Sequence, residues 1–470
     1  MEASFDYSLA VAAFSNYHSG NHTKCTFDSS KKLLEFEFDE YERAYWALHV
    51  FMSSRSNNET SLTYLAQFIL WFLNPSLWPD GVKQAVYDIC RRGLTVKYRF
   101  NSPIIKSLMD ELSSPPQLVP KEWGFPWATL QESRQFMKAL QAWCMYHLLM
   151  VHFGSLHLSV KGLGVASLCP VIGQRQFVRE MAILSDLKTS TVENIIQFLE
   201  LGIAVDTPDP VLQPLIPVAE RVFAIPAMNT ISSAYERNLL VLHARVDKPS
   251  FDLQSKSFEE GMTQTLIQTI GKRFPFHKTN TFIPFQGQAG EVDLIIADPM
   301  VHTILVGELR WFLPPGDPRE HIIKKKECIK KVQQLKPKVL AVQKNSLETL
   351  ELLGVSSREI DKSDWAVVGV VIVDGYSGVL SPTVDIPIVP QYVFIEGIQK
   401  CANLHVFHDW LCSLVWLPQN KTHFVYKPVE ANFGEYRLQW EATDIQGQAE
   451  DYLRVYLPGS IENFSQILSF

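Results

Sequence analysis

The chain has 470 residues, of which 46% are hydrophobic and 20% are charged, and its formal net charge at pH 7 is −7. At roughly 100–200 residues per domain this length predicts two to four domains, and the apolar fraction argues against wholesale disorder. An acidic chain also argues against a protein that coats nucleic acid, although a local basic groove is compatible with it because binding is local.

Cysteine usage and hydropathy indicate the compartment. The chain has seven cysteines without a C-x-x-C pair, and its N-terminus has no basic residues before the first apolar stretch. These features favour free thiols in a reducing cytosol over a secreted disulfide scaffold. Two uncharged stretches, 61–78 and 139–160, are interrupted by proline or by several histidines, so they read as buried helices. We expect a cytoplasmic protein with no membrane span.

The first part of the chain, 1–176, is predicted to be a mainly helical domain. Residues 33–39 form the best strand. Beyond them, apolar residues recur at a spacing of three and four, which is the pattern of helices with one buried face. Such helices are predicted at 40–54, 62–73, 81–94, 102–114 and 128–153.

Residues 177–250 are predicted to form a smaller unit and a connector. A short helix at 177–187 precedes a second helix at 191–202, which Ser190 and Glu193 would start as a capping box. Two short strands follow within 214–226. Helix, turn, helix and hairpin is the order of a winged helix, and the alternative is a bundle segment with a hairpin. The alternative is favoured because basic residues are few: Arg175, Arg179 and Lys188.

From 251 to 400 helices and strands alternate, which predicts an α/β domain with a mixed central sheet. Helices are expected at 257–274 and 318–338. Strands are expected at 277–285, 291–299, 303–312, 365–375 and 389–398. Residues 401–470 are interpreted as a C-terminal extension packed on this domain. The fold class is therefore a helical N-terminal region followed by an α/β domain.

Two acidic residues occur on the predicted strands at positions that suit a shared site. Asp293 opens one apolar strand, and Glu308 lies near the end of the next strand, two residues before Arg310. Side chains at i and i+2 of a strand share a face, so Glu308 and Arg310 point the same way. If the two strands are antiparallel neighbours, Asp293 and Glu308 converge. Paired carboxylates suit the hard ions Mg²⁺ and Mn²⁺.

A third acid comes from the preceding helix. Glu259, Met262, Leu266 and Ile270 lie on one helical face, so Glu259 begins the stripe that faces inward. We therefore expect Glu259 to belong to the same site.

The run GEVDLIIAD, followed by ILVGELR, resembles the PD-(D/E)XK nuclease superfamily, which has the restriction-endonuclease-like fold. It is most similar to the Holliday-resolvase-like and small-nuclease branch. The resemblance covers residues 255–375, and it implies metal-dependent hydrolysis of phosphodiester bonds, usually in DNA. It further implies that Asp293 and Glu308 ligate Mg²⁺ or Mn²⁺, with Glu259 as a supporting acid.

The sequence departs from this pattern at the last motif position, where the family usually has lysine. Arg310 occupies it, and arginine is a poor substitute for a lysine that manages water or a proton, because it stays charged and is planar. Branches of the superfamily tolerate arginine at this position, so Arg310 stays among the predicted catalytic residues, and other branches supply the lysine from the next helix. The next helix offers Lys325 and Lys326, and Lys325 is our candidate. The alternative is a catalytically inactive nuclease-fold scaffold that binds nucleic acid or a partner protein.

The predicted helix after Arg310 is strongly basic. Between 318 and 344, nine Lys and Arg stand against two Glu, which gives a local charge of +7. Cations beside a carboxylate site suit a phosphate backbone, whereas the alternative is a solvated lysine-rich face. The nucleic-acid contacts are predicted to be Lys324, Lys326, Lys330 and Lys331. The N-terminal region is expected to recognise substrate or a protein partner, and an oligomer is compatible with the sequence. By analogy, the setting is bacterial antiviral defence or DNA processing.

Overall fold

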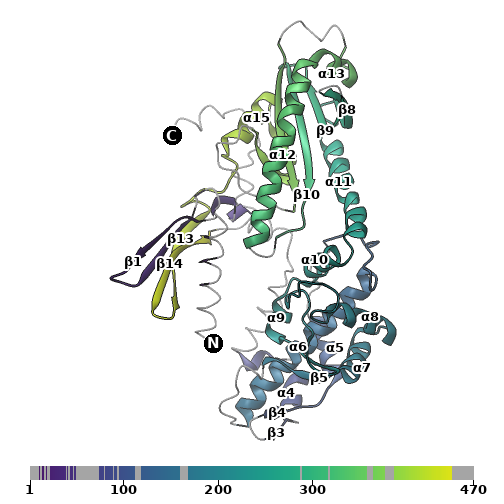
Figure 1. Cartoon of the computed structure of the whole chain (residues 1–470), viewed down its shortest axis with the longest axis vertical. Coiled ribbons are helices and arrows are strands. Elements are labelled where there is room, and N and C mark those ends of the chain that lie inside the picture. Colours follow the sequence, from purple (N-terminus) through teal and green to yellow (C-terminus); the bar gives the residue numbers. More distant parts are fainter. Residues whose placement is uncertain are drawn as a thin grey trace. The chain divides into compact units, whose positions relative to one another are not determined.

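Figure 1 shows the computed structural model of the chain, which consists of two compact units. We call Met1–Arg55 together with Lys256–Phe470 the discontinuous unit, and Ser56–Ser255 the inserted unit. This division differs from the expected boundaries at 176 and 250, because the first 55 residues group with the second half of the chain. The structure describes residues 10, 13, 14, 17, 22–38, 40, 43–45, 47, 48, 74–78, 80–87, 89–92, 95–111, 118–158, 168–285, 288–315, 318–356, 364–375 and 386–446.

A five-stranded mixed sheet forms the centre of the discontinuous unit. Its strand order is β12-β11-β10-β9-β8, with β9 antiparallel to both neighbours and β10, β11 and β12 parallel to one another. The strands follow the chain in spatial order: β8 His277–Phe285, β9 Gln288–Asp298, β10 Thr303–Trp311, β11 Ala366–Asp374 and β12 Ile388–Pro390. The expected α/β domain with a mixed sheet is therefore present.

Helices cover both faces of this sheet because its strands are apolar on both sides. On one face Met262, Leu266 and Ile270 of α11 (Lys248–Ile270) pack against alternate strand residues. On the other face, α12 (Pro318–Lys344) contributes Cys328, Val332, Leu335 and Val342. Helix α12 lies along the strands in Figure 1, and α13 (Ser346–Leu353) continues from it.

The strand expected at 389–398 is wrong. Only Ile388–Pro390 is a strand, and α14 (Gln391–Lys400) follows it. The buried residues Val393, Phe394, Gly397 and Ile398 recur at helical rather than alternating spacing, and this stripe packs against the sheet and α15 (Leu404–Ser413).

The two ends of the described chain meet in a second sheet of the discontinuous unit, of order β1-β2-β14-β13. Strand β2 (Leu33–Phe38) is the predicted strand 33–39, and it pairs antiparallel with β1 (His22–Asp28) and parallel with β14 (Tyr436–Ile445). The hairpin partner of β14 is β13 (Phe424–Phe433), and Gly434 adopts φ +61° in their turn.

The inserted unit is built around the long helix α6 (Leu130–His157), which begins with a capping box between Thr129 and Glu132. It packs against the helices α4 (Asp80–Tyr87), α5 (Ser102–Glu111), α7 (Gln174–Ser185) and α9 (Ala227–Ser232). Helix α10 (Tyr235–Val246) lies in the same unit. The uncharged stretch of α6 is buried as expected, and no helix within the described ranges is long and apolar enough to cross a membrane. The stretch 61–73 lies outside the described residues.

The helix expected at 81–94 is too long. It ends at Tyr87, and a small hairpin follows, formed by β3 (Cys90–Arg92) and β4 (Thr95–Lys97). Arg91 and Arg92 interrupt the apolar spacing, and Thr95 and Val96 are β-branched residues that favour strands.

Residues 171–224 contain the helix, turn, helix and hairpin in the expected order. Helix α7 (Gln174–Ser185) and helix α8 (Thr189–Leu199) precede β6 (Ile216–Ala219) and β7 (Val222–Ala224), and β5 (Val171–Gly173) adds a strand in the order β5-β7-β6. The expected capping box at Ser190 is wrong. The helix already begins at Thr189, so Ser190 lies inside its first turn, and the N-cap residue Lys188 makes no side-chain bond.

Candidate active site

The ladder between β9 and β10 ends where the two predicted acids face each other. Leu294 pairs with Gly307, so the next antiparallel pair in register would be Asp293 and Glu308. Instead, the backbone N–H of Leu309 donates to Asp293 Oδ2 at 2.7 Å. The Asp293 side chain thus accepts a backbone N–H of β10 in place of a backbone carbonyl, and the pairing of β9 with β10 ends here.

Both acids lie on the face of the sheet that α12 covers. Ile304 and Val306 precede Glu308 at alternate positions of β10, and Ile295 follows Asp293 on β9. All three of these apolar residues belong to the core under α12. Because strand side chains alternate between faces, Asp293 and Glu308 point toward this helix.

Glu308 is buried and is held by two lysines of α12. Lys331 Nζ lies 2.7 Å from Oε1, and Lys338 Nζ lies 2.6 Å from Oε2. Only 4% of the Glu308 side chain is exposed, against 24% for Lys331 and 19% for Lys338. The lysines are seven residues apart, which places them on one helical face two turns apart. Both carboxylate oxygens therefore have a charge-assisted partner, as a buried carboxylate requires.

The pKa of Asp293 is raised by its buried position and by the neighbouring carboxylate of Glu308. Burial and the negative charge of Glu308 raise the pKa of Asp293 to about 6, against the opposing effects of the Leu309 N–H, Lys331 and Lys338. This coupling shows that the acid pair shares one environment. Within the described part of the chain, the second oxygen, Oδ1, has no hydrogen bond.

Arg310 is held at the rim of this cluster by two further acids. Its guanidinium lies 3.1 Å from Glu259 Oε1 on α11 and 4.0 Å from Glu327 Oε2 on α12. The side chains of all three residues are partly exposed. Beside them, Phe258 stacks on Trp311 with ring centroids 4.3 Å apart, which fixes the start of the Glu259 turn against β10. Glu259 thus joins the site through Arg310, and among the contacts of the described residues none links it directly to the acid pair.

The lysines that reach Glu308 are not the expected ones. The sequence favours Lys325, but the partners of Glu308 are Lys331 and Lys338. Lys338 is absent from the predicted site, and Lys331 is predicted only to contact nucleic acid. Of the other predicted contacts, Lys324 lies over the Phe312 ring at 5.2 Å, and Lys326 and Lys330 are exposed on α12.

The donor set of the acid pair suits a hard divalent ion. Asp293 and Glu308 offer only oxygen atoms, and Mg²⁺ is commonly bound by one or two carboxylates, with waters and substrate phosphates completing its shell. No group of three or more His, Cys, Asp and Glu that could hold a metal by itself occurs in the described ranges. The two carboxylates alone would supply only part of the ligand shell of such an ion.

Comparison with protein-family models, with curated proteins and with solved structures finds no match in any of the three. Function must therefore be inferred from the chemistry of this site.

Proposed function

We propose that this protein is a metal-dependent nuclease that hydrolyses phosphodiester bonds, and that its substrate is DNA. One observation carries the proposal. Two coupled carboxylates stand where two strands part, and two lysines from the following helix reach the same point. The helix, three-stranded meander, basic helix and parallel strand around this point support the resemblance of residues 255–375 to PD-(D/E)XK nucleases.

Asp293 and Glu308 would hold Mg²⁺ or Mn²⁺, which supplies a more acidic bound water and polarises a phosphate oxygen. Lys331 and Lys338 place ammonium groups beside the acids, where they can orient a water and stabilise negative charge on phosphate. Lys331 and Lys338 would replace the lysine that the family usually has at the position of Arg310. The partly exposed Arg310 can neutralise a phosphate at the rim, and exposed lysines of α12 can contact the backbone on either side.

A second candidate function is favoured by the same lysines. With Asp293 ionised, the two carboxylates are balanced by two ammonium groups, so the buried cluster is neutral without a metal. Such a closed cluster is what a catalytically inactive scaffold would keep, and the exposed basic surface of α12 would then bind nucleic acid without cutting it.

The test is cleavage of supercoiled plasmid DNA in Mg²⁺ and in Mn²⁺ by the full chain and its variants. We expect wild type to nick the plasmid, and Asp293→Asn and Glu308→Gln each to lose roughly 100-fold or more in rate, because each removes a charged metal ligand. The matched control is Glu291→Gln, an exposed acid on the same strand, which should cut like wild type.

The outcomes separate the two candidates. No cutting of any DNA or RNA by folded wild type would reject the nuclease and leave the scaffold. Cutting that persists in both site variants would reject the assignment of Asp293 and Glu308. The biological setting, bacterial antiviral defence or DNA processing, remains a proposal that rests on analogy with proteins of similar domain order.

A further inference from the structure

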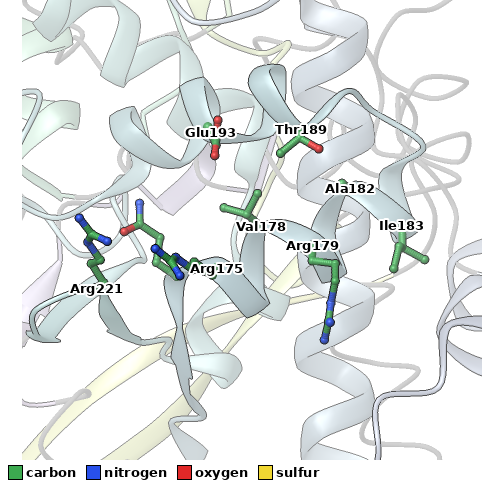
Figure 2. A pocket seen from close by; sticks show the side chains of 9 residues that line it. Arg175, Val178, Arg179, Ala182, Ile183, Thr189, Glu193 and Arg221 are labelled. Carbon is green, nitrogen blue, oxygen red and sulfur yellow. The ribbon is translucent and has the colours of Figure 1, made fainter.

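A hollow on the inserted unit gathers three arginines that the sequence alone did not bring together. It has a volume of about 690 Å³ and lies between the outer face of α7, the start of α8 and the turn between β6 and β7. Figure 2 shows Arg175 and Arg179 on α7, Arg221 in the hairpin turn, and Thr189 and Glu193 on α8. The hollow belongs to a different unit from the acid pair.

The backbone holds these arginines in defined positions. Arg175 and Arg179 are four residues apart on α7, so they project from one face of the helix. Arg221 has φ 56°, a conformation that few residues other than glycine adopt, and its carbonyl accepts a hydrogen bond of 2.8 Å from the N–H of Gln174. The hairpin turn is thereby fixed to the first residue of α7, with Arg221 beside Arg175.

Among the described residues, no ion pair neutralises the positive charge of the hollow. In the described ranges, neither an acid nor a side-chain acceptor pairs with Arg175, Arg179 or Arg221, and Glu193 is the one carboxylate that lines the hollow. Helices α7 and α8 both begin at the hollow without a side-chain cap, so their N–H groups add partial positive charge. An anion with several phosphates would relieve this repulsion, and arginine forks suit phosphate oxygens.

The exposed face of α8 next to the arginines points to the kind of polyanion. Apart from Glu193, which lines the hollow, its exposed residues are uncharged and polar: Thr189, Ser190, Asn194 and Gln197. Hydroxyl and amide groups of this kind form hydrogen bonds with the edges of bases. An α-helix fits the major groove of B-form DNA, whereas the corresponding groove of duplex RNA is too narrow for it.

We propose that the hollow binds the phosphate backbone of duplex DNA while the exposed face of α8 lies in the adjacent major groove. In such helix-turn-helix docking the first helix crosses the backbone and the N-terminal residues of the second contact base edges, which matches the positions of α7 and α8 at the hollow. The inserted unit then holds DNA by contacts separate from α12. This binding does not depend on whether the discontinuous unit cuts.

The test measures binding of the full-length protein to a fluorescently labelled DNA duplex by anisotropy, in EDTA so that no cleavage occurs. The variant Arg175→Gln, Arg179→Gln, Arg221→Asn removes the three charges, and asparagine tolerates the positive φ at the turn. We expect its affinity to fall roughly tenfold or more, and the slope of log K against log salt to become shallower by up to about 3, since each neutralised phosphate contributes about 0.9.

The matched control removes three exposed charges of the same unit that do not line the hollow: Lys97→Gln, Arg99→Gln and Lys121→Gln. It should bind DNA nearly as tightly as wild type. If it loses as much affinity as the hollow variant, bulk charge rather than the hollow binds DNA, and the proposal fails. It also fails if the hollow variant, folded by circular dichroism, binds with unchanged affinity and slope.

A variant that binds duplex DNA more tightly than wild type gives a further test, because misfolding would weaken binding rather than strengthen it. Glu193→Gln removes the one carboxylate of the hollow, and we expect it to tighten duplex DNA binding several-fold. Weaker binding by Glu193→Gln would contradict the proposal. A duplex RNA of the same sequence should compete poorly, and equal competition by RNA would reject the groove-bound helix.

Discussion

Glu308 is the most constrained residue of the candidate active site, because a buried carboxylate at this position depends on two ammonium groups. Lys331 and Lys338 each bind one of its oxygens, and both lysine side chains are themselves mostly buried. Removing one partner of such a cluster leaves charge without compensation in a poorly hydrated place, which costs more than an exposed ion pair contributes. The cluster is therefore both a catalytic candidate and a structural one.

The contribution of Lys331 and Lys338 can be tested by measuring the free energy of unfolding of variants that lack them. We expect Lys338→Met to lower the free energy of unfolding by about 1–3 kcal/mol, and the double variant Lys331→Met, Lys338→Met to lower it by about 3 kcal/mol or more, because Glu308 then has no cation. Urea unfolding at neutral pH measures both. Lys330→Met, an exposed neighbour, should change stability by less than about 0.5 kcal/mol. Equal effects of Lys338→Met and Lys330→Met would contradict a buried charge cluster.

His243 predicts a pH dependence of the inserted unit. It is fully buried among the rings of Trp123, Phe125, Trp127 and Phe251, and neither ring nitrogen has a hydrogen-bond partner in the described part of the chain. Burial holds the pKa of His243 below its usual range, with the charge of Asp247 acting in the opposite direction. The imidazole is thus neutral in the folded protein.

The sign of the effect follows from proton uptake. Below about pH 6.5 this histidine becomes protonated in the unfolded chain but stays neutral in the folded protein. The unfolded state therefore binds more protons, so the free energy of unfolding falls as the pH is lowered. We expect wild type to lose roughly 1 kcal/mol more stability than His243→Phe between about pH 7 and about pH 5, measured by urea unfolding at each pH. Parallel losses in the two proteins would show that His243 does not titrate this way.

At the scale of elements, the packing of α14 on α15 leaves no room for one methyl group. A Cβ at Gly397 would lie 2.3 Å from Trp410 Cζ3 and 2.9 Å from Phe407 Cε2, whereas a Cβ at Gly261 in α11 would meet nothing within 4 Å. We expect Gly397→Ala to destabilise the protein by about 1–3 kcal/mol through overpacking. The control Gly261→Ala should stabilise it by up to about 1 kcal/mol, because alanine is the better helix former.

Thermal unfolding of both glycine variants checks this pair of opposite effects. A melting temperature that moves the same way in both would contradict the packing described for α14 and α15.

The register of α12 shows why the sequence predicted the acids better than the lysines. An acid inside an apolar strand is conspicuous, so Asp293 and Glu308 could be found. On α12 the spacing of apolar residues favours a buried face through Ile322, Ile329 and Val332, but Ile329 is exposed and the buried stripe runs through Cys328, Val332 and Leu335. Lysine counts as a surface residue in any hydropathy pattern, although its stem can lie along apolar surface and its ammonium can reach a buried acid.

At the scale of the whole molecule, the sequence could predict elements but not the grouping of the two chain ends. Leu33 pairs with Arg437 and Phe36 with Trp440, across some four hundred residues that include the whole inserted unit. Strand periodicity shows that a segment is extended and half-buried, but it does not select a partner. The same limit explains the hollow, since Arg221 comes to Arg175 only through a hairpin that returns to the start of α7.

Charge is also distributed unevenly over the chain. The segment 318–344 carries +7 and the remainder of the chain −14, while the hollow concentrates three arginines on a second surface. The acidity of the chain is therefore compatible with DNA contact at defined places and argues against indiscriminate binding.

The proposed nuclease is tested most directly by the rate at which the full-length protein nicks supercoiled DNA in Mg²⁺, with Asp293→Asn measured in parallel. We predict metal-dependent nicking by wild type that is abolished by EDTA and reduced roughly 100-fold or more in the variant. Equal nicking by the two proteins, or no nicking by folded wild type in either Mg²⁺ or Mn²⁺, would contradict the central claim.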